Sequence, residues 1–356
     1  MDFVYKFPVV KGSQATREYY IAMAPLKMLP RLFPPEEEYV SPEYRAQRRI
    51  NEARIPIITK YILENRDTYV FSALACSIDG AFQFIPVSED ENIGVLEISM
   101  DAKFLINDGQ HRKAAIVEAL KEDASLGEET ISIVFYADKG LERSQQIFTD
   151  LNKNAIKTSN SISELYDSRD QIAVITRNVI KKIEFLNAYT DKEKDILGKF
   201  SSSLFTLNTF YTANKTILGN KVDEKSEGFI FEFWFLVTNH MAPWADLMRK
   251  EVTKKDLREK YIATQGIVIQ AFGRIGAFFY QNPEINMKVS LQGLKSIDWS
   301  RDVSIWHMRA INQNGRIITN KRAATLIGNV IKGAIGLPLS PDEAFAENQL
   351  QNTVRL

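Results

Sequence analysis

The sequence is poor in the residues that build disulfide frameworks and metal sites. It has a single cysteine, Cys76, and three histidines, His111, His240 and His307, that lie far apart in the chain. A lone cysteine excludes an intramolecular disulfide framework and a cysteine-based zinc site, and it fits a reducing compartment. Because the histidines show no H-x-x-x-H spacing, we expect no metal site built on histidine.

The sequence also lacks an excess of either charge and a long apolar run. Lysine and arginine number 45 and aspartate and glutamate number 45, so the formal net charge is 0. Any DNA contact must then come from a local basic cluster, because neutralising phosphates takes clustered lysine and arginine. No window approaches the roughly 20 apolar residues of a membrane span, and the first ten residues lack a signal core. We expect a cytoplasmic protein without a membrane segment.

With 356 residues, the chain suits two domains. Residues 1–165 mix strand and helix patterns, and residues 166–356 are mainly helical, so the predicted fold class is α+β. The first strand runs from Phe3 to a break at Gly12-Ser13. Asp79-Gly80 is a hairpin turn signal between two strand patterns, 69–76 and 81–87, that we expect to pair with each other.

Other elements follow from periodicity and from capping residues. Further strands are predicted at residues 18–24, 104–106 and 131–136. Helices are predicted from about Pro42 to Asn65 with a kink at Pro56, after Gly109, at 144–151, and at 170–186, 228–239, 255–280 and 321–334. Ser161 and Glu164 form a capping-box pattern, and Gly336 is placed to end the last of these helices.

The strongest local pattern is Asp108-Gly109-Gln110-His111-Arg112, between a short apolar strand and a helix. Helix N-termini carry N–H groups that lack an intrahelical acceptor and attract anions. Gly109 permits the turn or a close ligand, Arg112 can fork onto a phosphate, and His111 can donate to a phosphate or move a proton. Asp108 can cap the helix, hold a metal or orient water, so Asp108 and His111 are the candidate catalytic residues. The alternative is that Asp108-Gly109 only marks the start of a helix, with His111 and Arg112 exposed in its first turn and without a binding role.

The same five residues resemble the signature of the DGQHR-domain family, which looks like a branch of the ParB/sulfiredoxin fold. In ParB-like proteins a second motif, at the end of the next helix, completes a nucleotide-phosphate pocket. The resemblance therefore implies a ParB/sulfiredoxin-like N-terminal domain with a helical C-terminal domain. It also implies a nucleotide- or phosphate-binding set that unites Gly109 to Arg112 with residues after the helix ending near residue 152. This second group is Asn152, Lys153, Lys157 and Ser159.

One departure from sulfiredoxin is informative. Sulfiredoxin carries its catalytic cysteine directly before the His-Arg pair, where this sequence has Gln110. Glutamine is no nucleophile for sulfur chemistry, and Cys76 lies in an apolar strand pattern typical of a buried residue. The chain is therefore not expected to be a sulfinic acid reductase.

Larger stretches resemble the DndB family of DNA phosphorothioation regulators. They are residues 45–61, the DGQHR segment, residues 151–159, and Asp298-Trp299 through Trp306 to Gly336-Leu337. This resemblance implies a DNA-binding repressor of the modification genes, whose partners are promoter DNA, a nucleotide (ATP or another NTP with Mg²⁺) and other phosphorothioation proteins. A homodimer is plausible, because two half-sites strengthen operator binding.

Direct support for DNA binding comes from an arginine cluster on the predicted helix 42–65, made of Arg45, Arg48, Arg49 and Arg54. A second basic run at 250–260 is interleaved with acids and is more typical of a solvated face. Two other functions stay open. The first is a nucleoside triphosphatase or DNA nickase that uses Asp108 and His111. The second is a scaffold that docks the modification enzymes through the aromatic stretch 229–235, although such a stretch is more typical of a buried core.

Overall fold

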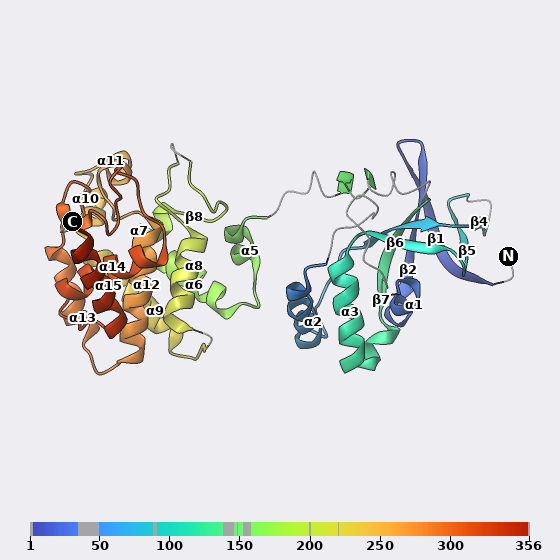
Figure 1. Cartoon of the computed structure of the whole chain (residues 1–356), viewed down its shortest axis with the longest axis horizontal. Coiled ribbons are helices and arrows are strands. Elements are labelled where there is room, and N and C mark those ends of the chain that lie inside the picture. Colours follow the sequence, from blue (N-terminus) through green and yellow to red (C-terminus); the bar gives the residue numbers. More distant parts are fainter. Residues whose placement is uncertain are drawn as a thin grey trace. The chain divides into compact units, whose positions relative to one another are not determined.

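A mixed sheet of seven strands organises the first part of the chain in the computed structural model (Figure 1). The structure describes residues 3–34, 50–87, 91–137, 146–147, 149–151, 158–198, 201–219 and 221–354. The strands are β1 (Val4–Gln14), β2 (Arg17–Pro25), β3 (Leu74–Asp79), β4 (Phe82–Pro86), β5 (Ile93–Ser99), β6 (Lys103–Asp108) and β7 (Thr130–Ala137). Their order across the sheet is β4-β5-β1-β2-β7-β3-β6, so β6, which leads into the DGQHR segment, lies at one edge.

The β1–β2 hairpin is longer than the sequence predicts. The pairing continues through Gly12 and Ser13 to Gln14, and the turn consists of Ala15 (φ 49°) and Thr16 (φ 64°). Two successive residues with positive φ give a turn whose twist matches that of the flanking strands. The expected break at Gly12-Ser13 was therefore wrong.

The expected hairpin around Asp79-Gly80 was also wrong. β3 pairs with β7 in parallel and with β6 in antiparallel orientation, whereas β4 pairs with β5. The chain does bend at Gly80, which has φ 145° and lies against Ala102. β3 is buried from Leu74 to Ile78, and such a strand belongs between two others, which a two-stranded hairpin cannot provide.

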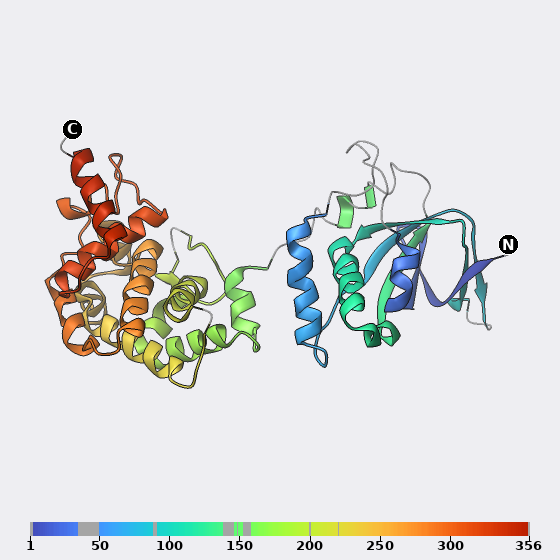
Figure 2. The same ribbon diagram turned by 60° about the horizontal axis from the view of Figure 1, so that its bottom comes forward.

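Short helices complete this first part. They are η1 (Leu26–Met28), α1 (Leu29–Leu32), η3 (Glu52–Arg54), α2 (Ile55–Glu64), α3 (Gln110–Glu122) and η4 (Ala124–Glu128). Pro56 lies in the first turn of α2, where proline is tolerated, and it starts the helix instead of kinking it. α2 and α3 lie side by side (Figures 1 and 2). Residues 42–49 of the predicted helix 42–65 lie outside the described residues. Of the predicted helix 144–151, the described residues 146, 147 and 149–151 are helical, as predicted.

One face of the sheet and these helices enclose the first core. It includes Phe7, Tyr20, Phe135 and Ile116, all at most 4% exposed. Cys76 belongs to the same core and is fully buried, as its apolar strand pattern predicts.

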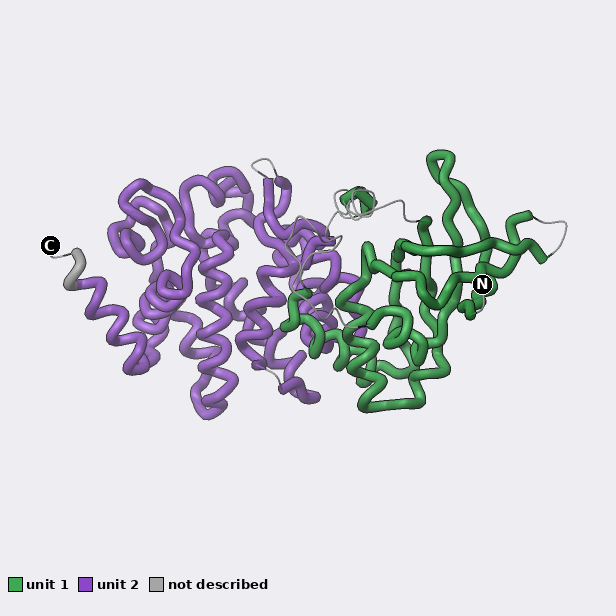
Figure 3. Tube along the Cα trace, turned by 45° about the vertical axis from the view of Figure 1, so that its right-hand side comes forward, with its two compact units in different colours: residues 1–156 green, residues 157–356 purple. Residues whose placement is uncertain are grey.

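The chain divides into two compact units, residues 1–156 and 157–356 (Figure 3). Helix α5 (Asn160–Tyr166) belongs to the second unit, whereas the sequence places the boundary at the end of this helix. Its N-cap is Ser159, whose hydroxyl accepts the N–H of Ile162. The expected capping box at Ser161 and Glu164 is wrong, because both side chains are buried inside the second unit.

The second unit is almost entirely helical, as predicted. Its longer elements are α6 (Gln171–Lys182), α7 (Glu184–Tyr189), α8 (Leu207–Leu218), α9 (Ser226–His240), α10 (Ala242–Met248), α11 (Lys254–Lys260), α12 (Gly266–Gln281), α14 (Lys321–Ala334) and α15 (Pro341–Val354). Short elements are β8 (Thr190–Asp191), β9 (Phe205–Thr206), α13 (Met287–Ser290), η5 (Leu291–Ser296) and η6 (Ser304–Trp306). The predicted helix 170–186 divides at Ile183, and the predicted helix 255–280 consists of α11 and α12. Gly336 follows α14 with φ 73°, as predicted.

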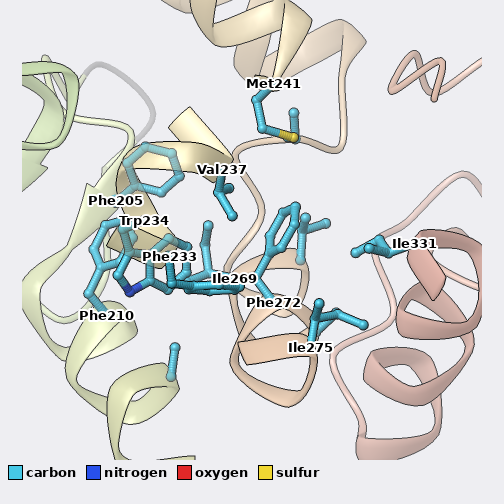
Figure 4. Close-up of a cluster of buried hydrophobic side chains, with 14 of the residues drawn as sticks. Phe205, Phe210, Phe233, Trp234, Val237, Met241, Ile269, Phe272, Ile275 and Ile331 are labelled. Carbon is cyan, nitrogen blue, oxygen red and sulfur yellow. The ribbon is translucent and has the colours of Figure 1, made fainter. Parts of the chain in front are cut away.

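The aromatic stretch at 229–235 belongs mainly to the core of the second unit (Figure 4). Phe233 and Trp234 are fully buried and contact each other, and Trp234 also packs against Phe210 and Phe272, whereas Phe235 remains 45% exposed. No helix among the described residues is long and apolar enough to cross a membrane.

Candidate functional site

The DGQHR segment joins a sheet edge to a helix start, as the sequence predicts. Asp108 ends β6, Gly109 is the N-cap with φ 100° and ψ 14°, and α3 begins at Gln110. A Cβ on residue 109 would lie 2.4 Å from Cδ2 of Leu74. Both the positive φ and this close approach require glycine at position 109.

Arg112 points back onto its own fold. Its Nη2 pairs with Oδ2 of Asp108 at 2.6 Å, and its Nη1 donates to the carbonyls of Ser72 (2.7 Å) and Ala73 (3.0 Å) and to the Ser72 hydroxyl. The side chain of Arg112 is 16% exposed and that of Asp108 is 48% exposed. The guanidinium therefore fixes the loop before β3 against the helix start. Asp108 is engaged in this ion pair, and the N-cap position has no side-chain hydrogen bond.

His111 is bound to the segment that precedes α2. Its Nε2 accepts the backbone N–H of Asn51 at 3.0 Å. An imidazole nitrogen that accepts a hydrogen bond is unprotonated, so the neutral ring carries its proton on Nδ1. Nε2 must release Asn51 before it can take a proton from a substrate or donate to a phosphate. The contact also brings η3, which carries the exposed Arg54, next to the start of α3.

A buried polar pair lies directly before the turn. The register of β3 and β6 shifts between Ala75 and Cys76, so Asn107 is the extra residue of a β-bulge. Asn107 is 1% exposed, its Nδ2 donates to Oγ of Ser77 at 2.7 Å, and its Oδ1 is buried without a hydrogen-bond partner in the structure. The unsatisfied amide oxygen next to Asp108 marks a place where a donor would be stabilising.

The remaining predicted site residues are not brought together in the described part of the chain. Asn152, Lys153 and Lys157 lie outside the described residues, and so do Arg45, Arg48 and Arg49. Ser159 lies in the second unit, caps α5 and donates its hydroxyl to the carbonyl of Glu193. The second half of the predicted pocket therefore stays a prediction.

The basic run at 250–260 pairs largely within its own unit. Lys260 lies 2.9 Å from Asp256, and Arg258 donates to the backbone carbonyls of Gly198 and Ser201. Thr253 and Asp256 form a capping box at the start of α11. These contacts agree with the interpretation of this run as a solvated, internally paired face.

The arrangement at 108–112 can bind an anion. A helix of 13 residues starts at the end of a strand, and its dipole places positive potential at Gln110 and His111. Backbone N–H groups of a helix's first turn are donors of the kind that bind phosphate oxygens, and His111 lies in the first turn of α3. The half-exposed carboxylate of Asp108 is the motif's candidate for a magnesium ligand. Among the described residues no three His, Cys, Asp or Glu side chains are grouped as a metal site.

The fold and site define an α+β protein in which the edge strand β6 leads through Gly109 into the start of α3, followed by a helical unit. The family model for DndB, described as DNA-sulfur modification-associated, matches residues 7–338. This chain belongs to the DndB family and is involved in DNA sulfur modification. Searches of curated proteins and of solved structures find no match.

Proposed function

We propose that this chain is a DNA-binding transcriptional repressor of the phosphorothioate-modification genes, gated by a nucleotide bound at residues 109–112. The observation that carries the proposal is the strand–glycine–helix junction, in which Gly109 has φ 100° and α3 starts one residue later. Family membership supplies the DNA context.

A link between the anion site and DNA binding is supported by the bond from Asn51 to His111. Asn51 precedes Arg54 by three residues and belongs to the segment that carries the arginine cluster. A phosphate that takes His111 as a donor must displace the N–H of Asn51 from Nε2. This exchange would move the segment before α2, and nucleotide binding would thereby change the presentation of the arginines.

The second candidate function is a nucleoside triphosphatase or DNA nickase that uses Asp108 and His111. Two observations favour binding over this chemistry. Asp108 is engaged by Arg112 at 2.6 Å, and Nε2 of His111 is engaged by Asn51 at 3.0 Å. A two-metal mechanism also needs several convergent carboxylates, and the motif contributes one.

The test is promoter-DNA binding by the full chain, with and without ATP and magnesium, over a series of salt concentrations. For the wild type we expect promoter-specific binding that ATP changes. His111→Ala should abolish the ATP response and keep promoter binding. Lys121→Ala, at the exposed C-terminal end of the same helix, is the matched control and should behave as the wild type.

The arginine cluster is tested by the salt dependence of the same assay. Replacing Arg45, Arg48, Arg49 and Arg54 by alanine should lower the slope of log K against log salt by roughly 3 to 4, because each lost phosphate contact removes about 0.9. ATP binding should stay unchanged. ATP turnover or strand nicking without promoter preference would move the protein to the enzyme class.

A further inference from the structure

The face of the sheet that points away from the first core carries an apolar row across four neighbouring strands. Val10 of β1 is opposite Ile93 of β5 and Ile21 of β2, and Ile21 is opposite Val134 of β7. Ile93 is 51% exposed, Val10 53% and Ile21 42%. Because alternate side chains of a strand share a face, these four point to the same side, away from Phe7 and the first core.

A second apolar row runs parallel to the first. Met23 of β2 and Pro8 of β1 lie on the same face, Pro8 is opposite Val95 of β5, and Val95 is opposite Ile85 of β4. Met23 is 69% exposed, Ile85 is 39% exposed and Pro8 is also exposed. We call the two rows together the apolar sheet face. Its members are Pro8, Val10, Ile21, Met23, Ile85, Ile93, Val95 and Val134.

Single exposed apolar residues need no explanation, but a contiguous set does. The apolar sheet face contains no charged residue, and strand pairing places its members side by side over five strands. Its exposed side chains present on the order of 500 Å² of apolar surface, the size at which a patch marks a contact site. The strands concerned are labelled in Figure 1.

The apolar, uncharged character of this face indicates which kind of partner it contacts. DNA needs a basic surface, and the nearest charges, Lys6 and Glu97, neutralise each other at 2.7 Å on the rim. A sheet face can be covered by another sheet face that packs about 10 Å away. A two-fold axis places the same face of a second copy opposite this one. The Lys6–Glu97 ion pair, which carries no net charge, then lies at the edge of the contact on both copies, where each charge can face the opposite charge of the other copy. Pro86 ends the outer strand β4 and weighs against edge-to-edge pairing instead.

We propose that the apolar sheet face is the homodimer interface of this protein. Together with the rim, two copies would bury about 1,000 to 1,200 Å², the lower end of the range for specific complexes. The dimer therefore dissociates at low concentration. It places two copies of unit 1 with their sheets stacked, and the DGQHR helix starts are outside the contact.

The experiment is the mass of the full chain by light scattering and sedimentation equilibrium from roughly 1 to 100 μM. The wild type should change from one chain to two over this range. Ile21→Lys should remain a single chain at every concentration. Ile57→Lys is the matched control, because Ile57 is 70% exposed on α2, outside the face, and this variant should dimerise as the wild type does.

A second measurement does not depend on disrupting the fold. Val10→Cys should form an interchain disulfide on mild oxidation, because Cys76 is buried and Val10 lies on the middle strand of the apolar sheet face, where a two-fold axis brings equivalent residues together. Val70→Cys, at a position 77% exposed but outside the face, should not. A wild type that stays a single chain at all concentrations, or a dimer that survives Ile21→Lys, overturns the proposal.

Discussion

Replacing Glu164 by glutamine should remove a pH dependence from the stability of the second unit. Glu164 is 9% exposed, and its Oε2 is buried without a hydrogen-bond partner in the structure. Burial, with smaller contributions from Asp195 and Asp170, raises its pKa from 4.5 to about 7, while Lys215 opposes the shift. The two aspartates accept hydrogen bonds from neighbouring backbone N–H groups and hold negative charge close by.

The sign of the effect follows from the direction of the shift. The folded chain binds this proton more tightly than the unfolded chain, so this group stabilises the fold fully below pH 4.5. That stability is lost as the pH rises to about 7, and above pH 7 the loss is complete. At 1.36 kcal/mol per pKa unit, the loss is about 3 kcal/mol, which we take as an upper bound.

The assay is guanidinium denaturation followed by tryptophan fluorescence at about pH 5 and about pH 8. All four tryptophans lie in residues 157–356, so the signal reports the unit that contains Glu164. Relative to the wild type, Glu164→Gln should gain much more stability at the higher pH than at the lower pH. Glu193→Gln, an exposed carboxyl nearby, is the control and should shift neither curve. An equal difference between wild type and Glu164→Gln at both pH values would refute the reasoning.

Two glycine substitutions should change stability in opposite directions in calorimetric unfolding of the full chain. Gly109→Ala should destabilise the fold by about 1 to 3 kcal/mol, because φ is 100° and the new Cβ meets Leu74. Gly328→Ala should stabilise α14 by roughly 0.5 to 1 kcal/mol, because its new Cβ has nothing within 4 Å. Equal effects of the two substitutions would contradict the backbone geometry at these positions. Asn214→Leu should destabilise the second unit by about 1 to 3 kcal/mol, because it leaves the indole N–H of Trp234 without its buried acceptor at 2.7 Å. Unchanged denaturation midpoints would show that this bond contributes nothing.

The structure changes how variants of the DGQHR segment should be interpreted. Arg112→Ala removes the contacts that hold Ser72, Ala73 and Asp108 in place, as well as a positive charge. A loss of nucleotide binding in that variant therefore has two explanations. His111→Ala leaves these contacts of Arg112 intact and is the cleaner test of ligand contact.

Local patterns in the sequence determined a large part of the fold. Gly109 between an apolar strand and a helix-forming run predicted the site junction, and the all-apolar run around Cys76 predicted a buried strand. Gly336 after a long amphipathic run predicted the end of α14. These features depend on backbone freedom, helix propensity and burial, which act between residues close in the chain.

Only the tertiary structure decided which distant groups meet. The sequence placed β3 in a hairpin with β4, but its burial between β6 and β7 depends on strands far away in the chain. Likewise, no local pattern shows that Arg112 is held by the loop before β3 or that His111 accepts the N–H of Asn51. On β1 and β2, apolar residues occupy both strand faces, so alternation could not tell the core face from the apolar sheet face. Local sequence fixes which elements form, whereas partners far apart in the chain are set by the packing of the whole sheet.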